Sequence, residues 1–271
     1  MKLHRLLTIG FLLCSTQAWA SGVVNLGLLD INQFLKIPGS IIPQDVINEA
    51  MKTFALYTVH RPYSGATSMF SSNSMDINLE ATMVKIGGGF GNAISAAGIP
   101  ETSSTASMPA VPVAKVNVRR AFGESVDVGF SGLVFKGQSV LGGDIKLVLD
   151  EPEEGPAWAL RLGFTHVNLP IAYIKNCNVI APELLISKRL MFAEPYLGVG
   201  FRYIHGTLDI PLSELYPTIP DIVHDGYAFD EYVFTGVYFR LLGATGLRLG
   251  VEGSFDVSGF HTIGTVVGLG F

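Results

Sequence analysis

The last eleven residues, His261–Phe271, read H-T-I-G-T-V-V-G-L-G-F. Every second residue from Ile263 to Phe271 is apolar or β-branched, and the residues between them are small or polar except Val266. A period of two predicts a β-strand with one apolar face. Chain ends usually fray in water, so a strand that finishes on an apolar side chain is unusual for a soluble protein. The stretch therefore predicts a closing strand whose apolar face meets something other than water.

This closing strand and its terminal Phe271 resemble the end of bacterial outer-membrane β-barrel proteins. The resemblance implies an all-β fold, a transmembrane antiparallel up-and-down barrel in a Gram-negative outer membrane. It also implies that Phe271 is part of the signal read by the barrel-assembly machinery. Outer-membrane lipid and lipopolysaccharide would then surround the barrel, and we expect a monomer.

The composition is typical of such a barrel. Hydrophobic residues make up 48% of the 271 residues, charged residues only 15%, and the mean hydropathy is +0.40. Beyond the N-terminus there is no run of 18 apolar residues, which excludes a helical membrane span. A transmembrane barrel instead places its apolar residues at alternate positions of many strands. The net charge of −5 gives no reason to expect nucleic-acid binding.

The N-terminal part of the chain does not read as barrel wall. Residues 1–20 have a basic start, an apolar middle and a small-x-small end, which predicts a signal peptide. Residues 21–70 contain an amphipathic pattern after Pro43 that predicts a helix of about four turns. Its apolar stripe consists of Val46, Ile47, Ala50, Met51 and Phe54. We expect this segment to plug the lumen from the periplasmic side or to rest on the periplasmic rim, with residues 71–271 forming the barrel.

Ten stretches of alternating residues predict about ten strands, an even number as in single-chain bacterial barrels. They are residues 76–83, 114–119, 126–131, 144–149, 158–165, 182–187, 196–203, 233–239, 247–256 and 261–271. The stretch at Pro182 is the weakest, so eight or twelve strands are the alternatives. The predicted connections after the first, fifth and seventh strands are long, including the loops 87–109 and 206–230. Those after the even-numbered strands are short, which places the long loops outside the cell.

The polar faces of these strands carry charges that we expect to line the lumen. The candidates are Glu80, Lys115, Arg119, Asp127, Asp144, Lys146, Arg161, Glu183, Arg202, Arg240, Arg248 and Glu252; with Asp76 and Asp256 they make seven acids and seven bases. A barrel of about ten strands is only slightly wider than one that side chains fill completely. The set therefore predicts a cross-linked ionic lumen. In the alternative, Arg161, Arg202, Arg240 and Arg248 line a narrow path for an anionic solute.

Residues that could carry catalysis are scattered. Omptin-type proteases use Asp and His residues, for which Asp221, His224 and Asp225 are the nearest candidates, and outer-membrane phospholipases pair Ser with His, for which His166 and His205 are considered. No matching Asp pair is apparent for the first set, and the sequence places no Ser where either His could activate it. No cluster has metal-ligand spacing, and the glycine run 87–91 lacks the Lys of a phosphate-binding loop. We expect no enzymatic activity, no metal and no cofactor. Cys177 is the only Cys after the leader, so no intrachain disulfide is expected.

Residues 60–67, followed by residues 75–81, resemble the entry into the barrel of an uncharacterised group of Gram-negative outer-membrane proteins. The run Glu194–Gly200 is similar to a run found in many outer-membrane barrels. This resemblance implies no binding or catalytic residue. Three hypotheses follow for function: a narrow channel for small solutes plugged by the N-terminal segment, a non-conducting surface-interaction barrel using loops 87–109 and 206–230, or a conduit for hydrophobic compounds. The third would use the apolar residues Phe135, Leu185 and Ile204, which the alternation points inward.

Overall fold

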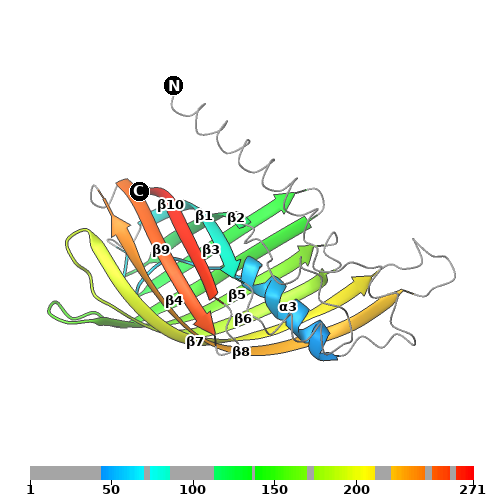
Figure 1. Ribbon diagram of the computed structural model, residues 1–271. Helices are drawn as coiled ribbons and strands as arrows, with labels where there is room; N and C mark the ends of the chain where they lie inside the picture. The colour runs from blue at the N-terminus through cyan, green and yellow to red at the C-terminus, as the bar shows by residue number, and fades with distance from the viewer. Residues whose placement is uncertain are drawn as a thin grey trace, which may run out of the picture.

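The computed structural model describes residues 44–69, 74–85, 113–135, 138–169, 174–210, 221–241, 246–256 and 261–271. Within them, ten antiparallel strands form a closed barrel (Figure 1), which confirms the predicted fold class and strand number. The strands are β1 (Met75–Lys85), β2 (Val113–Phe122), β3 (Val126–Phe135), β4 (Gln138–Asp150), β5 (Ala157–Leu169), β6 (Ile174–Ser187), β7 (Ala193–Ile210), β8 (Ile222–Arg240), β9 (Gly246–Asp256) and β10 (His261–Gly270). The expected leader, residues 21–43 and the expected loop 87–109 lie outside the described residues.

The closing strand completes the barrel by pairing with the first. β10 pairs with β1 from Asp76↔Gly270 to Lys85↔His261. Beyond the last pair, Phe271 and Met75 exchange two backbone hydrogen bonds of 2.8 and 3.1 Å. The terminal residue therefore belongs to the seam that closes the sheet.

The alternation in the sequence becomes two different faces of the wall. On β5, the side chains of Trp158, Leu160 and Leu162 are half exposed on the outside, whereas Ala159 and Arg161 are buried inside. The same alternation holds along the other strands, so the outer surface is apolar and the inner surface is polar and charged. No helix of the described residues is long and apolar enough to cross a membrane.

The two ends of the barrel differ. We call the end that carries the turns 123–125, 151–156 and 188–192 the short-turn end, and the end where β7 leads into β8 the long-loop end. The predicted loop 206–230 is wrong, because β7 and β8 stay paired from Gly206↔Gly226 to Ile210↔Ile222. Polar residues such as Asp225 interrupt the apolar alternation there, since this hairpin extends past the end of its neighbour β9.

The long connection expected after the fifth strand is also wrong, because β6 begins at Ile174, close after the end of β5. Two irregularities interrupt the regular pairing of β6, and its first part was not predicted. Asn176 has a positive φ of 51° beside a register shift against β7. Farther along, Pro182 pairs with Leu162 on β5, but the pairs with β7 skip residues 181 and 182. Proline has no N–H group to donate to a second neighbour, so the ladder is interrupted at that point.

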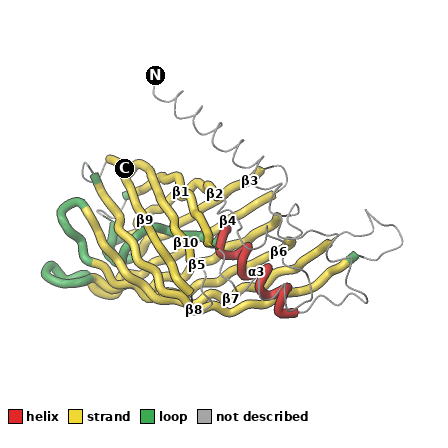
Figure 2. Tube along the Cα trace, in the orientation of Figure 1, coloured by secondary structure: helices red, strands yellow, loops and turns green. Residues whose placement is uncertain are grey.

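The predicted amphipathic helix is present as α3 (Gln44–Thr58), and it packs inside the barrel against β8 and β7. Figure 2 shows this helix lying along the barrel, away from the C-terminus. Its first turn contacts the β8 part of the long-loop end, where Gln44 Nε2 donates to the Asp225 carbonyl at 2.8 Å. The helix therefore lies in the lumen at the opposite end from the short turns. This position does not agree with two expectations held together, namely that the short turns face the periplasm and that the helix lies at the periplasmic mouth or rim.

Candidate functional site

The described residues 44–69 run through the lumen of the barrel. We call α3 the plug helix, residues 59–69 the strap, and both together the plug. The plug helix starts at the long-loop end, and the strap reaches the short-turn end, where Ser68 N donates to Glu151 Oε2 at 2.8 Å. β1 begins at the same end, where Met75 pairs with Arg120 close to the turn 123–125. The plug therefore passes from one end of the barrel to the other.

The plug helix sits on a shelf of small residues on the inner wall. Ile47 and Met51 are fully buried against Gly206 and Gly226, which pair with each other on β7 and β8. A Cβ at Gly226 would stand 2.7 Å from Met51 Cγ, so a larger residue there requires the Met51 side chain to shift or to be shortened. Cys177 of β6 borders the same shelf and is buried. Of the predicted apolar stripe, Val46, Ala50 and Phe54 have side chains outside the described set.

The plug helix also covers an open strand edge. β9 ends at Asp256 opposite Tyr232, so the earlier part of β8 has no β9 residue beside it. Asn48 Oδ1 accepts a hydrogen bond from Tyr227 N at 2.9 Å on that edge. Lys52 then bridges the two strands, with its Nζ 2.8 Å from Asp230 and 3.4 Å from Asp256. Covering an edge with a helix satisfies backbone groups that would otherwise be unpaired.

Two wall lysines hold the strap in the same way. Lys115 Nζ is 2.5 Å from Glu80 and donates to the carbonyls of Thr58 and Val59 at 3.1 and 2.8 Å. Both wall side chains are fully buried. An ammonium group has three donors, so one N–H of Lys115 binds the wall acid and two bind the plug backbone.

Lys146 repeats this arrangement nearer the short-turn end. Its Nζ is 2.7 Å from Asp127 and donates to the carbonyls of Gly65 and Thr67 at 3.1 and 2.6 Å. Each lysine therefore satisfies its charge on the wall and directs its remaining donors at main-chain oxygens of the strap.

The strap amides are also bound by wall side chains. His60 N donates to Thr165 Oγ1 at 2.8 Å. Ala66 N donates to Ser187 Oγ at 2.7 Å, and Thr67 N donates to Glu194 Oε1 at 3.1 Å. Buried main-chain groups are nearly always paired in native proteins, and here the barrel wall supplies the partners.

Three side chains of the strap reach four further wall residues. The His60 ring lies 2.7 Å from Ser131 Oγ and 2.6 Å from Asp144 Oδ1. Arg61 Nη1 is 3.4 Å from Glu252 Oε1. The Tyr63 hydroxyl is 3.1 Å from Thr82 Oγ1. Burial raises the pKa of the Tyr63 phenol well above its ordinary value, so this group stays neutral.

The structure places the predicted lumen residues on the inner face and brings them together as ion pairs. Besides the pairs described above, these are Arg119 with Asp144 and Asp127, Arg161 with Glu183, Arg202 with Asp230, Arg240 with Glu194, and Arg248 with Asp76. The arginines of the expected anion path thus each have a carboxylate partner. Glu194 and Asp230 were missed by the sequence reasoning. Extending the β7 alternation back by two residues would have found Glu194, whereas Asp230 fell in the wrongly predicted loop.

The lumen contains little free space where it is described. A cavity of about 10 Å³ lies between His60 and Pro62 of the strap and Phe164 and Ala181 of the wall, which is room for about one water molecule. Leu185, one of the residues considered for a hydrophobic path, packs in one cluster with Tyr63 and Ala66 of the strap. Ile204 is also fully buried, and the Phe135 side chain lies outside the described set.

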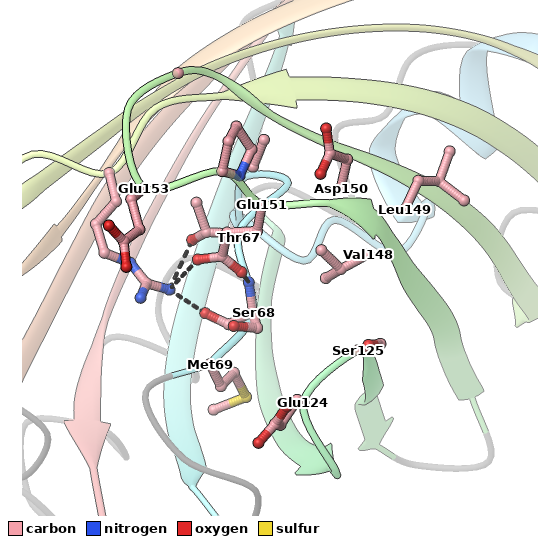
Figure 3. A pocket seen from close by; sticks show the side chains of 14 residues that line it. Thr67, Ser68, Met69, Glu124, Ser125, Val148, Leu149, Asp150, Glu151 and Glu153 are labelled. Carbon is pink, nitrogen blue, oxygen red and sulfur yellow. Dashed lines mark hydrogen bonds and ion pairs between the residues drawn. The ribbon is translucent and has the colours of Figure 1, made fainter.

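A larger pocket of about 910 Å³ opens at the short-turn end (Figure 3). The end of the strap lines it with Thr67, Ser68 and Met69, and turn residues including Glu124 and Asp150 line it from the wall. Arg189 binds the strap there, donating to Thr67 Oγ1 at 3.0 Å and to the Ser68 carbonyl, and it pairs with Glu151 at 3.3 Å. The strap therefore forms the floor of this pocket and separates it from the lumen.

The residues considered for catalysis have other contacts. Asp225 Oδ1 accepts a hydrogen bond from Thr207 at 2.9 Å, and His205 stacks on Tyr227 with ring centroids 4.7 Å apart. The His166 ring lies 2.9 Å from Asn178 Oδ1. Across the part of the chain that is described, no group of three or more His, Cys, Asp or Glu residues could hold a metal ion.

Comparisons with known proteins add little. No protein-family model matches the chain, and no curated protein matches its sequence. Solved structures give weak matches: the N-terminal β-barrel domain of OprF from Pseudomonas aeruginosa is 11% identical, covering 74% of this chain and 99% of that one with a TM-score of 0.34. Ail, the attachment invasion locus protein of Yersinia pestis, is 8% identical over 74% and 99% of the two chains, with a TM-score of 0.32. Neisserial surface protein A is 10% identical over 74% and 96%, with a TM-score of 0.28. Scores this low carry no inference about this chain.

Proposed function

We propose that this chain is an outer-membrane barrel whose outer surface contacts lipid. The apolar outer face supports this proposal: Phe130, Ile145 and Val199 stand half exposed or more on different strands. Only a hydrocarbon environment makes such a continuous apolar surface favourable, and a closed barrel leaves no unpaired strand edge in it. Lipid and lipopolysaccharide would cover this face, and the leader and Phe271 would direct export and assembly. The short-turn end would then face the periplasm.

We further propose that the barrel is a conduit for small solutes that its own plug keeps closed. The single observation that carries this proposal is the course of residues 44–69 through the lumen, bound to the wall at both ends. The described contacts between the plug and the wall are noncovalent, so the plug can leave the lumen while it stays joined to β1 and without disturbing the strand ladder. Passage of a solute then requires the plug to move.

The test is single-channel conductance in planar bilayers with a plug that can be locked. We choose M51C/G226C in a C177A background, because Met51 Cγ is only 2.7 Å from the position of a Cβ at residue 226. That places the two Cβ atoms within reach of a disulfide. We expect silence in buffer, and reversible currents at a urea concentration that leaves the barrel circular dichroism unchanged. The oxidised staple should abolish these currents and reduction should restore them.

The matched control is M51C alone in the same C177A background, which cannot form the staple and should conduct in urea with or without oxidant. Equal currents from the oxidised and reduced staple would show that the plug is not the barrier. Silence of every form up to unfolding of the barrel would show that there is no conduit.

A second function is supported by a different observation. The β7–β8 hairpin extends past β9 at the long-loop end and presents polar residues such as His224 and Asp225. A non-conducting barrel that binds a partner through this hairpin would have such a shape. Deletion of residues 207–224 would abolish partner attachment in that case and leave conductance unaffected. No observation in the described lumen favours the conduit for hydrophobic compounds.

A further inference from the structure

The wall of the lumen recognises the strap mainly through its main chain. Carbonyl oxygens of the plug accept hydrogen bonds from wall and turn side chains at Thr58, Val59, Arg61, Ser64, Gly65, Thr67 and Ser68. Amides donate to such side chains at His60, Ala66, Thr67 and Ser68. Main-chain hydrogen bonds give affinity that does not depend on sequence, and side-chain pockets add specificity. We propose that the lumen is a binding site for non-helical peptides, and that the strap is the intramolecular peptide occupying it.

The hydrogen-bond donors of this site are the ammonium groups of the two lysines. Departure of the strap would leave Lys115 and Lys146 each anchored to a wall acid, with two donors directed into the lumen. The two lysines bind carbonyls at opposite parts of the strap, Thr58 and Val59 for one, Gly65 and Thr67 for the other. An entering molecule must therefore offer pairs of neutral carbonyl oxygens at two separated places. A peptide main chain does so, whereas an inorganic anion does not.

The hydrogen-bond acceptors of the site are hydroxyl and carboxylate oxygens near the two lysines. Thr165 accepts from His60 N, next to the carbonyl that Lys115 binds. Ser187 accepts from Ala66 N, next to a carbonyl that Lys146 binds. At each place the wall thus contacts the N–H and the C=O of one peptide group, Val59–His60 and Gly65–Ala66. That pairing is specific to the amide unit of a polypeptide.

Side-chain recognition is concentrated in the first half of the strap. The His60 ring lies 2.7 Å from Ser131 Oγ and 2.6 Å from Asp144 Oδ1. Glu252 and Ser254 lie 3.4 Å from Arg61 Nη1, so a basic residue fits there. The Tyr63 ring occupies space left by Gly264, where a Cβ would stand 2.0 Å from the phenol oxygen. By contrast, Ser64 Oγ has no hydrogen-bond partner although it is buried. The preferred ligand is therefore a non-helical peptide with a histidine, then a basic residue, then an aromatic residue two positions after the basic one.

This inference rests on the proposed function, because a second peptide can enter only if the strap leaves. The test cuts the strap free after folding, so that the barrel is never required to fold alone. A site-specific protease sequence is inserted between Met69 and Ser74 of the full chain, the folded protein is cleaved, and the released N-terminal segment that ends at Met69 is washed out in mild urea. Binding of a fluorescent synthetic 44–69 peptide is then measured by anisotropy, and conductance is recorded in parallel.

The decisive probes are peptides in which a single amide is replaced by an ester. An ester at Ala66 removes the N–H that donates to Ser187 Oγ and makes the Gly65 carbonyl a weaker acceptor for Lys146. An ester at His60 removes the N–H that donates to Thr165 Oγ1 and makes the Val59 carbonyl a weaker acceptor for Lys115. Loss of hydrogen bonds that include a charged partner predicts binding about tenfold weaker or more for each ester. The matched control, S64A in the peptide, removes an unpaired hydroxyl and should change binding by less than about twofold.

Equal binding of the ester and amide peptides would overturn the inference, because recognition would then not involve the main chain. Failure of the native 44–69 peptide to bind a cleaved, washed barrel of unchanged circular dichroism would overturn it as well. Conductance that appears on cleavage without any peptide binding would leave the plugged conduit standing and refute only the peptide site. Peptide binding with no conductance before or after cleavage would refute the conduit instead.

Discussion

Replacing Lys146 by Met tests whether the stability of the barrel depends on the buried lysine that pairs with Asp127 and binds the strap. Lys146 Nζ holds Asp127 at 2.7 Å and two strap carbonyls, with the side chain 1% exposed. Removing one partner of a buried ion pair costs roughly 3–5 kcal/mol, because the other charge stays buried without compensation. Arg119 remains near Asp127 but only at 3.9 Å. We therefore expect K146M to lower the free energy of unfolding by about 4 kcal/mol.

Removing both charges should be less harmful than removing one. In K146M/D127L no buried charge is orphaned, and the remaining cost is that of the unpaired strap carbonyls, about 2 kcal/mol. The assay is urea unfolding in lipid vesicles, followed by fluorescence of Trp158, the only tryptophan after the expected leader. K175M is the matched control: Lys175 pairs with Asp209 at the rim with 51% of its side chain exposed, so its loss should cost less than about 1 kcal/mol. A double variant as unstable as K146M, or K146M no worse than K175M, would refute the reasoning.

Three further predictions concern the helix seat, the lipid face and the seam. G226A should displace the plug helix, because the added Cβ would stand 2.7 Å from Met51 Cγ, and currents should appear at lower urea. V199R puts a charge on the outer face and should lower stability in vesicles by about 2–4 kcal/mol if the site lies near the bilayer midplane. F271A keeps the backbone bonds to Met75 but should slow assembly in cells if the terminal side chain is read by the assembly machinery, as measured by the yield of heat-modifiable barrel.

Each of these has a matched control in the chain. G253A adds a Cβ whose nearest neighbour is 3.8 Å away, so it should leave the currents unchanged. M191R lies in a turn at 96% exposure and should be tolerated in vesicles. A conservative F271Y should assemble at the normal rate. If a control variant shows the same effect as the variant to which it is matched, the physical reason given for that effect is wrong.

The wall was predictable because its pattern is local. Alternation from Ile263 to Phe271 or from Trp158 to Phe164 follows directly from a strand with lipid on one side and lumen on the other. The prediction failed where a strand extends beyond its neighbour or where its regular pairing is interrupted. The β7–β8 hairpin passes beyond its neighbour and carries polar residues at outer positions, and β6 is interrupted at Asn176 and Pro182.

The strap was not predictable in this way. Residues 59–69 have no regular period, since their conformation is set by wall groups from β1 to β9 rather than by their neighbours in sequence. The sequence also gave no means of deciding which end of the barrel the helix occupies. That choice depends on the glycine pair at residues 206 and 226, whose significance appears only when the strands are in register.

Charge balance in the lumen leads to a last prediction. The described wall has nine inward acids and seven inward bases in its ion pairs. The acids are Asp76, Glu80, Asp127, Asp144, Glu183, Glu194, Asp230, Glu252 and Asp256; the bases are Lys115, Arg119, Lys146, Arg161, Arg202, Arg240 and Arg248. Lys52 and Arg61 of the plug pair with acids of this wall. Because the plug also contains Asp45 and Glu49, its formal net charge is zero, and the excess of acids belongs to the wall.

An opened barrel should consequently select cations. Without the plug, the wall retains two more acids than bases in a narrow space of low dielectric constant, where like charges raise the concentration of counter-ions. The reversal potential of the urea-opened channel in a salt gradient should have the sign of cation selectivity. Replacing Glu252 and Asp256 by Gln and Asn should abolish that preference, because it removes the two carboxylates that Arg61 and Lys52 contact. Anion selectivity in the unmodified channel would contradict this account. It would instead favour the alternative in which the wall arginines line a path for anions. Cation selectivity would instead explain why two basic side chains of the plug, Lys52 and Arg61, pair with acids of the wall.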